Sequence, residues 1–155
     1  RTIPHLNYDK ATDRLHSLTG ANFAVLREAL ERVGPFDERL GPGASGTSED
    51  IELARRFTQA GIDIGYMQEA IAYHRVDRSR LTEEYFKSLH KKQGKSRLLM
   101  KDRSVTHILF GLCGMTTLYG INCLFSRERR RYRSKGRIYH YLGMLEAKWN
   151  GQADK

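Results

Sequence analysis

The clearest periodic pattern in the chain covers residues 47–60. At about 100° per residue, Leu53 and Phe57 fall on the same side of a helix as Asp50. The opposite side receives Glu52, Arg55, Arg56 and Gln59. Thr47, followed three residues later by Asp50, fits a capping box at a helix start. The pattern predicts an amphipathic helix that follows a flexible, glycine-rich loop and runs to about Ala60, with Gly61 as its C′ residue.

Asp50 therefore lies on the apolar side of the predicted helix, in its first turn. A carboxylate is costly to bury, so it needs partners there. It either caps backbone N–H groups at the helix start or faces a polar cavity. The segment alone fits both interpretations, a structural cap and a functional carboxylate.

Short apolar runs flank this helix on both sides. Residues 21–25 and 62–66 have the length and composition of strands, and residues 70–73 form a shorter extended piece. Apolar side chains at helical spacing over residues 26–33 predict a helix that ends at a Gly-Pro stop signal. The alternation of strands and helices predicts an α/β fold for this half of the chain.

The second half of the chain is predicted to be helical. Thr82 fits a helix cap, with Glu83 and Glu84 in the first turn. Residues 104–126 contain no Asp, Glu, Lys or Arg, and about 20 apolar residues suffice to span a bilayer. Glycines and threonines dilute this stretch, so a buried helix or a helix at a membrane interface is favoured over a true span.

Basic residues follow directly, in the arginine-rich run of residues 127–137. Apolar side chains at helical spacing over residues 138–149 predict a last helix. The whole chain has a formal net charge of +9 and a pI near 9.8, which points to an anionic partner. The run suits anionic lipid headgroups, although a solvated helix face explains it equally well. Only Tyr132 is interleaved with the charges and no reading motif accompanies them, which argues against nucleic acid.

Length, composition and the start of the chain add three expectations. The chain has 155 residues, with 39% hydrophobic and 29% charged side chains, as in one soluble globular domain. Cys113 and Cys123 lack metal-ligand spacing and suit free thiols in a reducing compartment, which favours the cytoplasm. The chain begins at Arg1 without a signal-peptide pattern, so we expect a fragment of a longer protein.

Five segments, in order and at matching spacing, resemble the acceptor-side half of family 2 inverting glycosyltransferases of the GT-A fold. They begin at Gly20 (Gly-Ala-Asn-Phe-Ala), Leu30 (Leu-Glu-Arg-Val-Gly-Pro-Phe-Asp-Glu), Ser48 (Ser-Glu-Asp-Ile-Glu-Leu-Ala-Arg-Arg), Gly61 (Gly-Ile-Asp-Ile-Gly-Tyr) and Ala70 (Ala-Ile-Ala-Tyr-His). The resemblance covers residues 20–96 and implies a metal-dependent enzyme of polysaccharide biosynthesis. Its substrates would be a nucleoside-diphosphate sugar donor and a hydroxyl of a saccharide or lipid-linked acceptor.

The resemblance also assigns acceptor-side roles. The aspartate of the Glu-Asp pair is the catalytic base in the family, and here it falls on Asp50, with Glu49 shaping the acceptor site. An inverting transfer needs one carboxylate that takes the proton from the acceptor hydroxyl. Asn22 matches a position at the floor of the acceptor site, although a turn residue explains it as well.

Donor-side roles follow in the same way. His74 matches a histidine that binds the Mn²⁺ or Mg²⁺ ion on the donor diphosphate, and otherwise is a polar residue at a strand end. Arg78 and Arg80 have the forked, permanently charged donors that suit a diphosphate leaving group, and otherwise are solvated loop arginines. Gln93 and Arg97 depart from the spacing of processive members, which argues against processive synthesis.

The resemblance implies a partial GT-A fold in residues 1–96, lacking the N-terminal nucleotide-binding half, and a helical, basic extension in residues 97–155. No Asp-x-Asp occurs in the sequence, so we expect the donor half upstream and the isolated chain to be inactive. The alternative function is a basic, non-catalytic module that binds an anionic membrane or nucleic acid. Localisation is expected to be cytoplasmic, with peripheral attachment at the inner face of the membrane left open.

Overall fold

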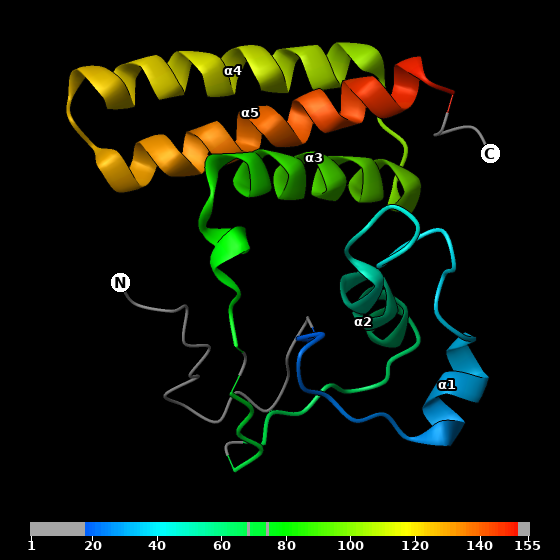
Figure 1. Cartoon of the computed structure of the whole chain (residues 1–155). Coiled ribbons are helices and arrows are strands. Elements are labelled where there is room, and N and C mark those ends of the chain that lie inside the picture. Colours follow the sequence, from blue (N-terminus) through cyan, green and yellow to red (C-terminus); the bar gives the residue numbers. More distant parts are fainter. Residues whose placement is uncertain (1–17, 68, 74, 152–155) are drawn as a thin grey trace. The chain divides into compact units, whose positions relative to one another are not determined.

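The computed structural model describes residues 18–67, 69–73 and 75–151. Its helices are α1 (Arg27–Val33), α2 (Glu49–Gln59), the short 3₁₀ helix η1 (Arg78–Leu81), α3 (Glu83–Met100), α4 (Val105–Leu124) and α5 (Glu128–Trp149) (Figure 1). The chain divides into two compact units. The first unit comprises residues 18–37 and 49–75, and the second comprises residues 38–48 and 76–151.

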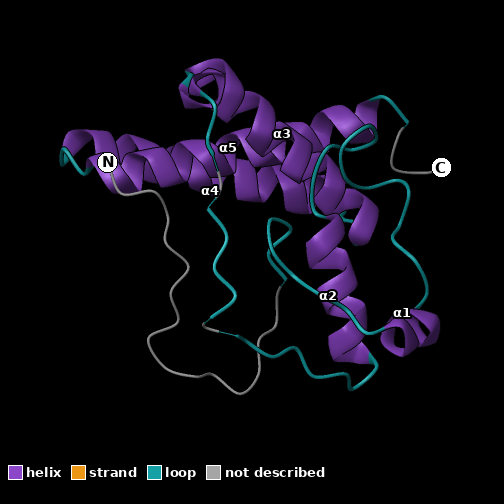
Figure 2. Ribbon diagram, turned by 60° about the horizontal axis from the view of Figure 1, so that its bottom comes forward, coloured by secondary structure: helices purple, strands orange, loops and turns teal. Residues whose placement is uncertain are grey.

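The predicted α/β fold, and with it the partial GT-A fold, is wrong. The described residues contain helices and loops but no strand (Figure 2). The runs at 21–25, 62–66 and 70–73 are turns and loops, in which side chains such as Ile64 pack against the helices. A strand exists only when its backbone pairs with a neighbouring strand. An apolar run indicates that its side chains are buried, but it does not indicate whether a partner strand is present.

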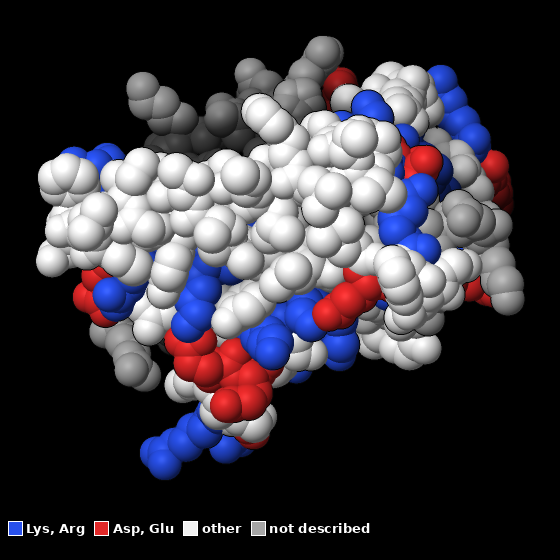
Figure 3. Space-filling view, turned by 90° about the horizontal axis from the view of Figure 1, so that it is seen from above, with Lys and Arg blue, Asp and Glu red and all other residues white. Residues whose placement is uncertain are grey.

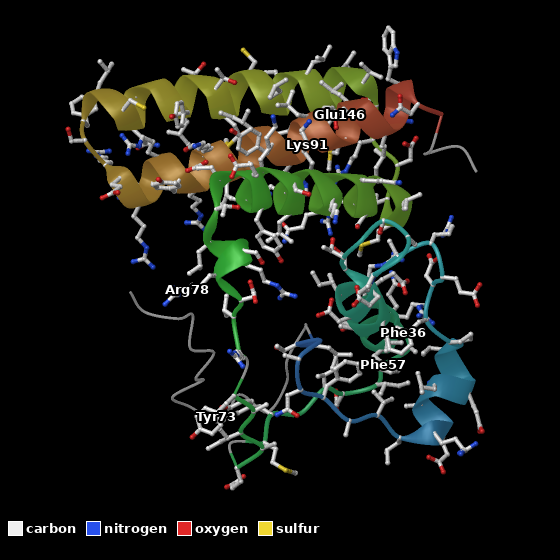
Figure 4. All side chains as sticks on the ribbon, in the orientation of Figure 1. Phe36, Phe57, Tyr73, Arg78, Lys91 and Glu146 are labelled. Carbon is white, nitrogen blue, oxygen red and sulfur yellow. The ribbon has the colours of Figure 1, made fainter. Side chains whose placement is uncertain are left out.

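The predicted amphipathic helix is confirmed as α2. Leu53, Ala54 and Phe57 are buried and form the core of the first unit together with Ile64, and the side chain of Phe57 is drawn in Figure 4. The helix ends as predicted at Gly61, with a positive φ of 69°. Its amide donates to the Thr58 carbonyl and the Ile62 amide to the Phe57 carbonyl, which is the Schellman arrangement.

The predicted outer face of α2 is wrong at Glu52, which is buried. Its carboxylate accepts from Arg56 Nε at 2.8 Å and from Arg55 at 3.3 Å. The guanidinium of Arg56 also donates to the carbonyl oxygens of Val33, Gly34 and Pro35, at 2.7, 2.9 and 2.8 Å. These carbonyls end α1, so the ion pair within α2 also binds the end of the neighbouring helix.

The predicted start of α2 also differs, because the helix begins at Glu49 and Thr47 is not its cap. The Thr47 hydroxyl hydrogen-bonds Ser96 in α3 at 3.1 Å, and the buried Ser45 hydroxyl contacts the same serine at 2.8 Å. The glycine-rich loop that sequence analysis describes as flexible is therefore anchored to α3 within the second unit.

In the second unit, α5 packs against α3 on one side and against α4 on the other (Figure 1). The Thr82 cap is confirmed, since its hydroxyl accepts from the Tyr85 amide at 3.1 Å. Lys91 of α3 and Glu146 of α5 form an ion pair and point toward each other in Figure 4. Lys135 of α5 pairs with Glu83 at 2.6 Å at the other end of the same interface.

Glycines let α3 and α5 approach closely. A Cβ on Gly94 of α3 would overlap the His140 carbonyl oxygen, and a Cβ on Gly143 of α5 would overlap the backbone of Lys91. Backbone atoms cannot move away as a flexible side chain does. The spacing of the two helices therefore requires glycine at both positions.

We expect Gly94→Ala to lower the free energy of unfolding by about 2–3 kcal/mol, because the methyl group forces α3 and α5 apart. Gly114→Ala in α4 is the matched control, since a Cβ there meets nothing within 4 Å. It should raise stability by about 0.5–1 kcal/mol through its helix propensity. Urea unfolding followed by circular dichroism measures both changes, and equal stability of the two variants would contradict the close approach.

Stability of the second unit should also depend on pH. Burial lowers the pKa of His140 from its usual 6.5 to about 4, and the positive charges of Arg137, His90 and Arg97 act in the same direction. As the pH falls through this window, the unfolded chain takes up the proton before the folded chain does, so stability is lost. Because His140 is only half-buried, solvent screening limits the loss to on the order of 1–2 kcal/mol.

Urea unfolding at a series of pH values between 7 and 4 tests this expectation. His140→Gln should reduce the decline in that range, leaving the part that comes from His90, whose pKa is also lowered by burial, whereas His107→Gln, at an exposed histidine of α4, should leave the whole decline in place. A decline that is the same in both variants would show that His140 is not its cause.

Candidate functional site

Asp50 lies in the first turn of α2, with a half-buried side chain. Its Oδ2 accepts a hydrogen bond from the Gly20 amide at 2.8 Å, and its Oδ1 accepts from the Ile51 amide at 2.8 Å. The N-terminal end of a helix is also a favourable place for a negative charge. Of the two interpretations that the sequence left open, the bond from the Ile51 amide fits a cap at the helix start, and the distant donor Gly20 is a partner that the local pattern did not identify.

Gly20 is suited to this contact because it has no side chain. A Cβ at this position would lie 3.1 Å from Asp50 Oδ2, closer than ordinary van der Waals contact. The loop can therefore pass directly over the carboxylate. Each oxygen of a carboxylate can accept two hydrogen bonds, so each Asp50 oxygen can accept one more, for example from a hydroxyl.

Asn22 lies two residues beyond this contact. Its Nδ2 donates to the Ala70 carbonyl at 2.7 Å, so the side chain links the loop at residue 20 to the segment around residue 70. The structure thus brings Asn22 and Asp50, both predicted as acceptor-side residues, into one neighbourhood of the first unit. Glu49, the first residue of α2, is half-buried and directly precedes Asp50.

The predicted diphosphate ligands lie in the second unit. Arg78 and Arg80 are exposed side chains of η1, and Figure 4 shows where Arg78 projects from this turn. Asp77 fixes the turn, since its Oδ1 accepts from the Ser79 amide at 2.8 Å, and the hydrogen bonds from Ser79 lower the pKa of this carboxyl. The Arg80 guanidinium lies 5.8 Å from the centroid of the Tyr85 ring. The structure does not join these arginines to Asp50 within one unit.

His74, the predicted metal ligand, lies outside the described residues. Within residues 18–67, 69–73 and 75–151, no group of three or more His, Cys, Asp or Glu side chains is arranged to hold a metal ion. The described residues therefore supply no cage for Mn²⁺ or Mg²⁺, and the ion remains an expectation that comes from the resemblance alone.

Sequence analysis missed the contacts that hold this region together. The Glu52–Arg56 pair was assigned to solvent, although a glutamate four residues before an arginine is a recognisable pairing signal. The Gly20–Asp50 bond joins residues thirty positions apart. No local pattern reports such a contact.

No model of a known protein family, no curated protein and no solved structure matches the chain. The arrangement of Gly20, Asn22 and Asp50 is therefore interpreted from its own geometry and from the resemblance of its sequence segments.

Proposed function

We propose that the chain supplies the acceptor-side residues of an inverting glycosyltransferase, with Asp50 as general base. The enzyme moves a sugar from a nucleoside-diphosphate donor to a hydroxyl of a saccharide or lipid-linked saccharide. The observation that carries the proposal is the carboxylate of Asp50, fixed by the Gly20 and Ile51 amides at the start of α2.

A fixed carboxylate is what the reaction requires. The acceptor oxygen attacks the anomeric carbon from the face opposite the diphosphate, the bond from that carbon to the diphosphate oxygen breaks, and Asp50 takes the hydroxyl proton. The diphosphate leaves with the electron pair of the broken bond. Two backbone donors keep the carboxylate in one orientation without using all of its acceptor positions.

Asn22 and Glu49 support the acceptor in this proposal. The amide of Asn22 is oriented by the Ala70 carbonyl, which leaves its oxygen as an acceptor for a sugar hydroxyl. Glu49 adds a second half-buried carboxylate next to the base, where it suits a hydrogen bond from a neighbouring hydroxyl of the same sugar.

The donor side is proposed with fewer supporting contacts. Arg78 and Arg80 would bind the diphosphate of the donor, supported by their exposure and by the Asp77 cap that fixes their turn. A Mn²⁺ or Mg²⁺ ion held by His74 would neutralise diphosphate charge.

Asp50→Asn tests the proposal, because an amide still accepts from the Gly20 N–H but does not take a proton. We expect kcat to fall by about 100-fold or more, the usual contribution of a general base, with little change in helix content. The assay measures release of nucleoside diphosphate from a panel of donor sugars with Mn²⁺ or Mg²⁺, using the protein as its gene encodes it.

Glu31→Gln, at an exposed carboxylate of α1 in the same unit, is the matched control and should keep wild-type turnover. An Asp50→Asn variant that turns over at the wild-type rate would reject Asp50 as the base. If no donor and acceptor pair supports turnover by the wild type, the alternative of a non-catalytic basic module is favoured instead.

A further inference from the structure

The outer face of α4 is apolar and exposed to solvent. Only 11% of its most apolar 18-residue window is buried, and its buried side chains are Ile108 and Asn122. Of the two alternatives favoured from the sequence, a buried helix and a helix at a membrane interface, the low burial of α4 does not fit the first. Seen from above, the surface over this helix is a broad band of side chains other than Lys, Arg, Asp and Glu, with both basic and acidic side chains along its edges (Figure 3). Phe110 is 84% and Leu124 is 83% exposed.

Two polar side chains on this face, Thr116 and Thr117, are already hydrogen-bonded within the helix. The hydroxyl of Thr116 donates to the Leu112 carbonyl at 2.9 Å, and that of Thr117 donates to the Cys113 carbonyl at 3.1 Å. Hydroxyls that are bonded within the helix can enter an apolar medium without leaving an unpaired donor. The two threonines therefore do not oppose contact with lipid.

Positive charge and aromatic rings surround the two ends of the face. At the end of α4, the Arg127 guanidinium lies 5.3 Å from the centroid of the exposed Phe125 ring. Further arginines follow on α5, with exposed side chains at Arg129, Arg130 and Arg133. At the start of α4, a groove is lined by the apolar Val105, Leu109, Leu145 and Trp149 together with Glu146 and Asn150, and the indole of Trp149 is 93% exposed.

We propose that α4 lies flat in the interface of an anionic lipid bilayer, with its outer face in the lipid and the neighbouring arginines on the headgroup phosphates. An apolar face, a basic rim and aromatic rings at both ends are the features of a helix that lies in the membrane plane. This proposal does not depend on the glycosyl transfer proposed above.

The packing of α5 is the reason that α4 lies flat and does not span. Tyr141 of α5 contacts Gly111, and Ser134 of α5 hydrogen-bonds Asn122 at 3.2 Å, so the two helices are packed along the length of α4. The exposed Arg137 of α5 lies between these two contacts in sequence. A spanning α4 would therefore carry Arg137 toward the middle of the bilayer, where arginine is among the costliest side chains.

A bilayer fits this face better than a second copy of the chain. Arg127 in the α4–α5 turn and the arginines at the start of α5 give one end of α4 a positive charge, and the segment before the other end carries Lys101 and Arg103 with Asp102 between them. Packing two copies through α4 would place basic ends together in either orientation, whereas anionic headgroups complement both ends at once.

Vesicle binding by the 155-residue chain tests the proposal. We expect binding to vesicles of phosphatidylcholine with phosphatidylglycerol, and weaker binding to phosphatidylcholine alone. Phe110→Glu should weaken binding by about tenfold or more, since its exposed ring would enter the lipid. Ser88→Glu makes the same charge change on an exposed position of α3 and should alter binding by less than about twofold.

The arginines are tested separately. Arg129→Gln and Arg130→Gln should each weaken binding to the anionic vesicles by about fivefold. Trp149, the one tryptophan of the sequence, reports the contact directly: its emission should shift to the blue and be quenched by lipids brominated near the headgroup. Alkaline washing should release the bound chain from the vesicles.

Three results would overturn the proposal. Equal binding of Phe110→Glu and wild type would show that the α4 face does not contact the lipid. Resistance to alkaline washing would indicate a spanning helix. The third result is a wild-type chain that does not bind vesicles but forms a dimer, together with a Phe110→Glu variant that is a monomer. This result would show that the α4 face binds a second copy of the chain.

Discussion

The close approach of α3 and α5 is the contact on which the second unit depends. Gly94 and Gly143 let the two backbones meet, and the ion pairs Lys91–Glu146 and Lys135–Glu83 link the same two helices. With one side of α5 occupied by α3, α4 packs against another side and presents most of its own surface outward. The exposed apolar face is therefore a consequence of how α5 is shared between its two neighbours.

The first unit depends on a different kind of contact. Arg56 is held by Glu52 and donates to the carbonyls at the end of α1, so a buried ion pair fixes the two helices to each other. At the opposite end of α2, the Asp50 carboxylate holds the loop at Gly20. Charged side chains on α2 thus bind backbone groups at both ends of the helix. The Asp50 carboxylate also keeps unused acceptor positions, to which a substrate hydroxyl could donate.

Local sequence patterns predicted the features that depend on contacts between neighbouring residues. Helical spacing identified α2, and Thr82 and Gly61 marked a start and an end because capping involves neighbouring residues. The strand predictions failed because a strand depends on a partner that the run itself does not encode. Glu52 was assigned to solvent because hydropathy takes no account of a buried ion pair. The Gly20–Asp50 and Asn22–Ala70 contacts join distant segments, so only the fold reveals them.

The proposed orientation of α4 at a membrane combines the packing of this helix against α5 with the charges at its ends. Oriented circular dichroism of the chain on stacked anionic bilayers measures that orientation directly. The axes of α3, α4 and α5 run in nearly the same direction or its opposite (Figure 1). If α4 lies flat, all three helices therefore lie in the membrane plane, and the spectrum should be that of helices in this plane. A spectrum of helices along the membrane normal would contradict the account.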